Sequence, residues 1–217
     1  DGGTTPFHGE KGTTWEGGFR VPCIVKWPGK VKGGSKFNGI MSHEDWMPTL
    51  LNAAGVKGLV EKCKKGHKAN GKNFKVHLDG YDMSRYVSGE TKESPRETIF
   101  YFAATGELNA VRWKDWKAHF ATQEGAINTA VRQVTAWPMV INLKADPYEV
   151  APHESGMYLK WYAKNTMWIF VPIQQKVKEF LATIPGYPFQ PGSTLSASNI
   201  NYNTLKFQKI MKKLESK

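Results

Sequence analysis

Residues 8–25 read HGEKGTTWEGGFRVPCIV, a glycine-rich segment that leads directly into a short apolar run. Glycine at this density predicts a tight loop in which backbone comes close to backbone or to a ligand. The apolar run, residues 21–25, is rich in β-branched side chains and is closed by Trp27-Pro28-Gly29, which predicts a buried strand ended by a turn. Buried strands of this kind are typical of a mostly parallel sheet, so we expect an α/β fold.

The composition is that of a folded protein. Of the 217 residues 40% are hydrophobic, including 8 Trp, 8 Tyr and 11 Phe, which is enough bulky apolar surface for a sizeable core. No stretch approaches the roughly 20 apolar residues that a spanning helix needs, which predicts no transmembrane segment. The net charge of +11 attracts anions in general. Two cysteines, Cys23 and Cys63, cannot form a disulfide scaffold, and we expect both to be free.

The middle of the chain has a segment with a helical pattern followed by a lysine-rich segment. Ser42 and Asp45 have the spacing of a capping box, which predicts a turn at 43–47 and then a helix from near Pro48 to Ala54. Residues 57–75 hold seven lysines and one acidic residue, interspersed with glycines, and are expected to form an exposed loop or insertion.

The second half has short β-prone runs followed by helical ones. Strands are expected at 98–102, 110–113, 116–120 and 139–143, with an antiparallel hairpin turning at Lys114-Asp115. Pro172 is placed in the first turn of a helix, and a last helix is expected around residues 207–214. The change of pattern near Ser94-Pro95 predicts two parts, an α/β part over 1–94 and an α+β part over 95–217.

Lys11 is the strongest candidate for chemistry. A lysine among glycines can bring its ammonium to an anionic oxygen while backbone amides approach the same group. The alternative is a glycine-rich connector with a solvated lysine and an ion pair between Glu16 and Arg20, because glycine clusters are weak motifs.

Other candidates are weaker. Cys63 and His67 have a spacing that could ligate a metal ion, but a structural zinc site needs four protein ligands and no second pair is nearby. His43, beside two acidic residues, could act in acid–base chemistry or simply occupy a helix start. Only Phe74 could stack on bases among the lysines, so we expect no specific nucleic-acid site.

Four segments carry a family resemblance. TPFHGEKGTTWEGGFRVP (residues 5–22) closely resembles the loop and strand in the second half of type I sulfatases, particularly bacterial arylsulfatases. The later runs SHEDWMPTL (42–50), SPRE (94–97) and NLKADPYE (142–149) agree with that family in order. The resemblance extends over most of residues 4–184.

The resemblance implies the C-terminal part of an alkaline-phosphatase-like α/β fold: the end of the main sheet, then a subdomain with a small antiparallel sheet and helices. It also implies hydrolysis of sulfate esters at a formylglycine, assisted by a divalent cation that is commonly calcium in bacterial members. Lys11 matches a lysine that contacts the sulfate and stabilises charge near the leaving oxygen. His8 stands at a substrate-binding position where arginine is expected in many relatives, and Glu16 and Arg20 would support the loop.

The sequence also departs from the family pattern. It contains no Cys/Ser-x-Pro-x-Arg motif, from which formylglycine is made, and no Asp-Asn pair of the metal-binding kind. We therefore expect the nucleophile and metal ligands to lie outside this chain, in an N-terminal part that precedes Asp1, and this chain alone to be inactive. A periplasmic or secreted location follows from the resemblance only. The alternative is a noncatalytic module that binds sulfated or other polyanionic material through its basic surface.

Overall fold

A computed structural model describes residues 6–103, 106–125, 129–154 and 156–187, which form two compact units. Unit 1 joins Asp1–Val21 to Phe100–Lys217, and unit 2 is Pro22–Ile99. The glycine-rich N-terminal loop is thus in the same unit as the sheet, which begins about 80 residues later in the chain. Unit 1 is therefore discontinuous in sequence. The expected division into domains 1–94 and 95–217 stays a prediction. No helix in the described part of the chain is long and apolar enough to cross a membrane.

Unit 1 is built on a four-stranded sheet in the order β3-β4-β5-β6. The strands are β3 (Thr98–Phe102), β4 (Leu108–Trp113), β5 (Trp116–Glu124) and β6 (Val131–Asn142). β4 and β5 pair antiparallel with Trp113 opposite Trp116, which confirms the hairpin turn at Lys114-Asp115. β5 and β6 are also antiparallel, with an irregularity between His119 and Ala121.

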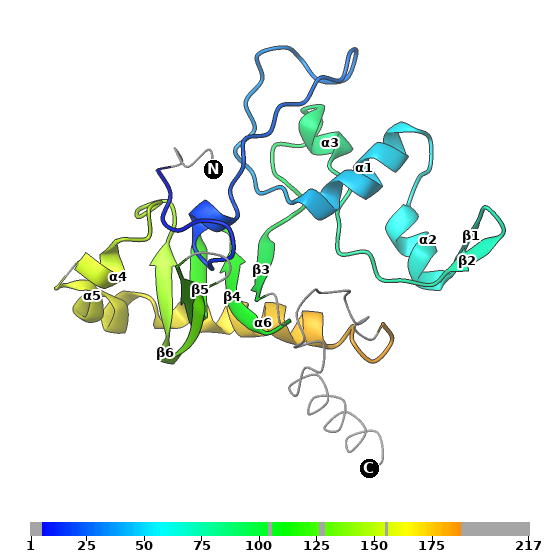
Figure 1. Cartoon of the computed structure of the whole chain (residues 1–217). Coiled ribbons are helices and arrows are strands. Elements are labelled where there is room, and N and C mark those ends of the chain that lie inside the picture. Colours follow the sequence, from blue (N-terminus) through cyan, green and yellow to red (C-terminus); the bar gives the residue numbers. More distant parts are fainter. Residues whose placement is uncertain (1–5, 104–105, 126–128, 155, 188–217) are drawn as a thin grey trace, which may run out of the picture. The chain divides into compact units, whose positions relative to one another are not determined.

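Both faces of this sheet are covered. The helices that follow β6 are α4 (Ala151–Glu154), α5 (Tyr158–Asn165), η3 (Met167–Ile169) and α6 (Phe170–Leu181), and α6 runs across the strands in Figure 1. On one face Val111, Ala118 and Val140 pack with buried residues from α5, η3 and α6. The alternate residues of the strands point the other way, where Ile141 packs against Trp15 of the N-terminal loop. The sheet is therefore a layer between helices and loop.

The helices agree in part with expectation. Pro172 lies in the first turn of α6, as predicted. Trp161 of α5 and Trp168 of η3 are 39% and 52% exposed, and both have ring contacts with Trp116 of β5. The helix expected around 207–214 lies outside the described residues.

Unit 2 holds the short helices and a hairpin. Its elements are η2 (His43–Asp45), α1 (Trp46–Ala53), α2 (Leu59–Lys65), β1 (His67–Ala69), β2 (Lys72–Phe74), α3 (Ser84–Val87) and the first residues of β3. Both hydrogen bonds of the capping box between Ser42 and Asp45 are present, which confirms that prediction. The helix begins at Trp46, so Pro48 falls in its first turn, where its missing N–H costs nothing.

A buried ion pair joins two of the family-resembling segments within unit 2. Arg96 donates from Nε and Nη2 to the two carboxylate oxygens of Asp45 at 2.8 and 2.6 Å, and from Nη1 to Glu44 at 2.9 Å. The Asp45 carboxylate also accepts the backbone N–H groups of Ser42 and Tyr81. Because the side chains of Arg96 and Asp45 are 4% and 0% exposed, this cluster holds the fold together rather than facing a substrate.

Two local predictions are wrong. Residues 21–25 form no strand, and Ile24 is 96% exposed, because no described strand pairs with this segment and a lone strand leaves its backbone groups unpaired. Residues 57–75 are not an irregular loop: they form α2 and the β1–β2 hairpin, whose two-residue turn Asn70-Gly71 has φ of +48° and +73°. Both cysteines are free, but Cys23 is exposed and Cys63 is buried on α2, the reverse of what was expected.

Candidate functional site

Lys11 occupies the corner of a tight turn. The N–H of Thr13 donates to the carbonyl oxygen of Glu10 at 3.0 Å, and the Thr13 hydroxyl donates to the same oxygen at 2.6 Å. Gly12 has φ +91°, which a side chain rarely tolerates, so glycine is required for this turn. The Lys11 side chain is exposed and forms no ion pair with another described residue. The turn therefore presents a free ammonium on a short, restrained piece of backbone.

The two arms of the loop that carries this turn, residues 6–20 (the Lys11 loop), are held against each other. The N–H of Gly17 donates to the carbonyl oxygen of His8 at 2.7 Å. A Cβ on Gly17 would lie against the carbonyl oxygens of Gly9 and His8, at 2.6 Å from the latter, so only glycine allows this approach. The density of glycine in the sequence is thus explained by backbone contacts within the loop.

Trp15 is the apolar anchor of the Lys11 loop. Its ring is fully buried, stacks on His8 with centroids 4.3 Å apart, and contacts the ring of His119 from β5 at 4.8 Å. His153 approaches the Trp15 ring edge-on at 5.5 Å. Three buried nitrogens in this cluster have no hydrogen-bond partner within the described residues: Nδ1 of His8, Nε1 of Trp15 and Nδ1 of His119.

Glu16 follows Trp15 and has a buried carboxylate surrounded by donors. Arg20 Nε lies 2.7 Å from Oε2, and the hydroxyl of Tyr101 donates to Oε1 at 2.7 Å. Lys117 Nζ lies 3.0 Å from Oε1, and Arg112 Nη1 lies 3.4 Å from Oε2. Burial alone would raise the pKa of Glu16, but these charges and hydrogen bonds outweigh it and lower the pKa to about 2. Glu16 is ionised at any physiological pH.

A second buried carboxylate, Glu149, lies beside the first. Its Oε2 accepts the backbone N–H of Glu16 at 2.6 Å, and its Oε1 lies 2.9 Å from Lys117 Nζ and 3.2 Å from His119 Nε2. Burial opposes its charge, yet the hydrogen bond from His119 and the charge of Lys117 lower the pKa of Glu149. Burial, with repulsion from Lys117, lowers the pKa of His119 to about 4, so its ring is neutral at pH 7.

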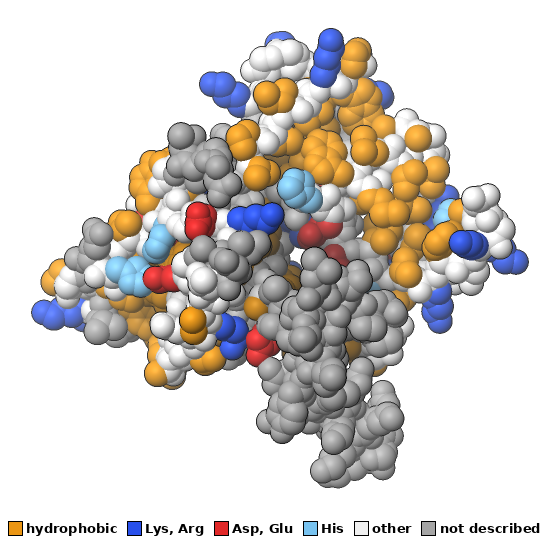
Figure 2. Space-filling view, viewed as in Figure 1, with side chains coloured by type: hydrophobic (Ala, Val, Ile, Leu, Met, Phe, Trp, Pro, Cys, Tyr) orange, Lys and Arg blue, Asp and Glu red, His pale blue; other side chains and the backbone are white. Residues whose placement is uncertain are grey.

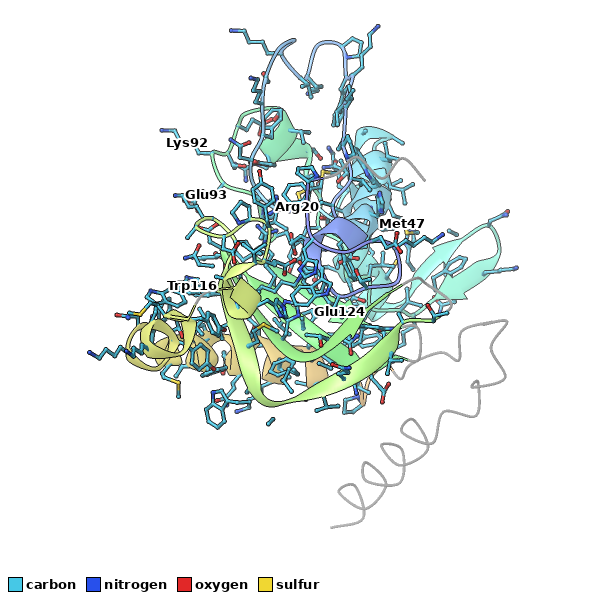
Figure 3. All side chains as sticks on the ribbon, turned by 60° about the vertical axis from the view of Figure 1, so that its left-hand side comes forward. Arg20, Met47, Lys92, Glu93, Trp116 and Glu124 are labelled. Atoms are coloured by element: carbon cyan, nitrogen blue, oxygen red, sulfur yellow. The ribbon has the colours of Figure 1, made fainter. Side chains whose placement is uncertain are left out.

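β5 supplies the surface on which the Lys11 loop lies. Lys117 Nζ donates to the carbonyl oxygen of Thr14 at 2.7 Å. Further along β5, the N–H of Gln123 donates to the Thr14 hydroxyl at 3.1 Å, and the N–H of Thr14 donates to the Gln123 carbonyl oxygen at 3.3 Å. In Figure 3, Trp116 and Glu124 mark the two ends of β5, and Arg20 marks the loop.

The residues expected from the sequence therefore fall into two groups. Lys11 is exposed, whereas His8, Glu16 and Arg20 take part in the packing and ion pairs beneath the turn. The structure adds five residues that sequence reasoning missed: Tyr101, Arg112, Lys117, His119 and Glu149. Glu149 lies within the resembling run NLKADPYE, which was a signal, but nothing in the sequence linked it to Glu16.

The described residues do not fit a metal ion. Within residues 6–103, 106–125, 129–154 and 156–187, no three His, Cys, Asp or Glu side chains gather in a way that could hold one. The two carboxylates under the Lys11 loop are already paired with Lys117 and its neighbours. What the arrangement can do chemically is present one exposed ammonium from a restrained piece of backbone, where it can bind a group carrying several anionic oxygens.

Comparisons with known proteins agree on one family. Residues 94–202 match the family described as the C-terminal region of aryl-sulfatase, and residues 1–56 match the sulfatase family. Arylsulfatase A of Bos taurus is 34% identical over 154 residues, which are 64% of this chain and 27% of that protein. Human steryl-sulfatase is 27% identical over 204 residues, which are 85% of this chain and 32% of that protein.

A solved structure agrees with the sequences. The crystal structure of PsFucS1 sulfatase from Pseudoalteromonas sp. matches with a TM-score of 0.68 and 28% identity, over 85% of this chain and 34% of that one. The chain thus spans about a quarter to a third of the length of the relatives it matches. The alkaline-phosphatase-like, mixed α/β fold class expected from the sequence is confirmed.

Proposed function

Because this chain belongs to the sulfatase family, we propose that it forms part of an enzyme that hydrolyses sulfate esters, and that Lys11 binds the sulfate group. The observation that carries the proposal is the turn at Glu10–Thr13: its ammonium has no ion-pair partner among the described residues, and buried ion pairs hold the loop that presents it. A sulfate ester has several anionic oxygens, and its leaving oxygen gains negative charge as the ester bond breaks. A fixed cation stabilises that developing charge more than it stabilises the ground state.

The other parts of the site would come from elsewhere. This sequence holds neither the motif that yields formylglycine nor an Asp-Asn pair, and the described side chains do not gather around a cation. We therefore propose that the residue attacking sulfur and the ligands of a divalent cation, such as calcium, belong to residues outside these 217. On this proposal the 217 residues alone do not turn over a sulfate ester, and the complete enzyme works in the periplasm or outside the cell.

His8, Glu16 and Arg20 have separate proposed roles. Glu16 and Arg20 support the loop through their ion pair at 2.7 Å. The ring of His8 stacks on Trp15 and its Nδ1 is buried. A direct contact between His8 and the substrate stays a prediction.

The test is the substitution Lys11→Ala in the complete protein, with steady-state hydrolysis of nitrophenyl sulfate as the assay. Removing one donor to a developing oxyanion typically costs about 10²–10³-fold in kcat, so kcat should fall by that factor and not only KM rise. The matched control is Lys144→Ala, an exposed lysine of the same unit. A Lys11→Ala protein that folds by circular dichroism and keeps kcat within about twofold of wild type would make Lys11 an ordinary loop residue.

A noncatalytic role in binding polyanions remains the alternative, and the exposed lysines of unit 2 favour it. Lys62, Lys65, Lys68 and Lys72 are exposed on α2 and the β1–β2 hairpin, and Figure 2 shows Lys and Arg side chains over this hairpin. Substituting these four with Ser should remove binding to heparin if the chain is a polyanion module. Under the enzyme proposal the same variant of the complete protein keeps its sulfatase activity.

A further inference from the structure

We infer that Glu149 is a positioning residue for Lys11: it fixes the backbone of the Lys11 loop, and through it the place of the Lys11 ammonium. This inference rests on the proposed role of Lys11 in binding sulfate. Glu149 does not itself reach the substrate, because its side chain is fully buried beneath the loop.

The first step is the contact between Glu149 and the loop backbone. Oε2 of Glu149 accepts the N–H of Glu16 at 2.6 Å, and this N–H belongs to the first residue of η1 (Glu16–Gly18). A charged acceptor on a backbone N–H makes a shorter and stronger bond than a neutral one. Glu149 therefore holds a point of the main chain five residues after Lys11.

The second step is what holds Glu149 in place. Its Oε1 lies 2.9 Å from Lys117 Nζ and 3.2 Å from His119 Nε2, and both of these side chains project from β5. Lys117 in turn donates to the carbonyl oxygen of Thr14 and pairs with Glu16. Each carboxylate oxygen of Glu149 thus has a defined partner, and one lysine connects the carboxylate, the loop backbone and the sheet.

The third step runs from this point to the ammonium. Thr14 is tied to Gln123 of β5, and Gly17 is tied to His8 on the other arm of the loop. Between these hydrogen bonds the chain forms the Glu10–Thr13 turn that carries Lys11. A displacement of about 1 Å in a positioned group can cost 10²-fold in rate. Loosening the backbone at Glu16 should therefore displace Lys11 and lower the rate.

The test uses Glu149→Gln in the complete protein, alone and combined with Lys11→Ala. Glutamine keeps the shape, but its amide group replaces one acceptor with a donor, so one of the contacts to the Glu16 N–H and Lys117 must be lost. We expect kcat for nitrophenyl sulfate to fall about 10- to 100-fold. In the Lys11→Ala background the same substitution should change kcat by less than about twofold, because the group it positions is already gone. The matched control is Glu124→Gln, an exposed acidic residue at the end of β5, which should leave kcat unchanged.

Amide hydrogen exchange gives a second readout. In Glu149→Gln the amides of Glu16 and Gly17 should exchange faster, while those of β4 keep wild-type rates. If Glu149→Gln does not fold, Glu149→Asp carries the test, since it keeps the charge but is too short to reach both partners.

The outcomes separate this inference from the proposed function. If Lys11→Ala lowers kcat but the Glu149 substitution leaves it unchanged, or lowers it equally with and without Lys11, Glu149 only stabilises the fold and the inference is wrong. If Lys11→Ala itself leaves kcat unchanged, the proposed role of Lys11 fails, and positioning by Glu149 fails with it. Loss of kcat that disappears in the double variant, with faster exchange at Glu16, supports both.

Discussion

Lowering the pH from 7 to 5 should destabilise unit 1 through one residue, His119. In the folded protein burial and Lys117 lower the pKa of His119 from 6.5 to about 4, so the ring stays neutral at pH 5. In the unfolded chain His119 takes up a proton below pH 6.5. Between pH 6.5 and 4 the unfolded state therefore binds more protons than the folded state, and the free energy of unfolding must fall as the pH falls.

The size of the effect follows from the same two values. A shift from 6.5 to about 4 corresponds to roughly 3 kcal/mol when fully expressed, and about 2 kcal/mol of it is lost by pH 5. Glu16, with its pKa lowered from 4.5 to about 2, acts in the same direction but contributes only about 0.2 kcal/mol at pH 5, because its unfolded form is still largely ionised there. The interval from pH 7 to 5 thus isolates His119, and the contribution of Glu16 is lost below about pH 4.5.

The assay is urea unfolding at pH 7 and pH 5, followed at the amide resonances of β5 so that unit 1 alone is measured. His119→Gln can still donate to Glu149 but cannot take up a proton, and it should remove most of the difference between the two pH values. His43→Gln, at an exposed histidine of unit 2, should leave the difference intact. An equal free energy of unfolding at both pH values, or a His119 ring proton that titrates near 6.5, would refute the reasoning.

Three further outcomes are expected. Gly17→Ala should destabilise unit 1 by about 1–3 kcal/mol in urea unfolding, because its Cβ meets backbone oxygens, whereas Gly33→Ala, with open space around it, should not; equal effects would contradict this. Arg96→Ala should cost unit 2 about 3–5 kcal/mol by leaving a buried carboxylate unpaired, and a loss below about 1 kcal/mol would argue against a structural ion pair. Alkylation followed by mass spectrometry should modify Cys23 in the folded protein and Cys63 only after denaturation, and rapid labelling of both would show that α2 does not pack as described.

The features predicted correctly from the sequence are those with a local cause. The hairpin at Lys114-Asp115, the capping box of Ser42 and Asp45, and the helix that begins just before Pro172 each depend on residues a few positions apart. The hairpin turn at Asn70-Gly71 also has a local signal, but the lysines around it favour an exposed loop.

The features that were missed depend on distant partners. Lysine and histidine within a strand normally indicate a solvated face, but the Lys11 loop and Glu149 lie over β5 and bury Lys117 and His119. Glu149 contacts the backbone of a residue 133 positions earlier, which no spacing rule connects. The strand expected at 21–25 was inferred from β-branched composition, but composition does not supply the neighbouring strand that such a segment needs.

Because unit 1 is discontinuous in sequence, its two segments are synthesised at different times and can fold together only late. Glu16 leaves the ribosome long before Lys117 and Glu149, from which it is separated by 101 and 133 residues. At about 5–20 residues per second, synthesis of the 133 residues from Glu16 to Glu149 takes roughly 7 to 27 s. Unit 2 is completed during this time, while the strands that the loop packs against are still incomplete. The residues of the Lys11 turn are synthesised early, but the partners that order them are synthesised late. A nascent chain that stops before β6 therefore carries Lys11 but lacks Glu149, which holds the loop backbone.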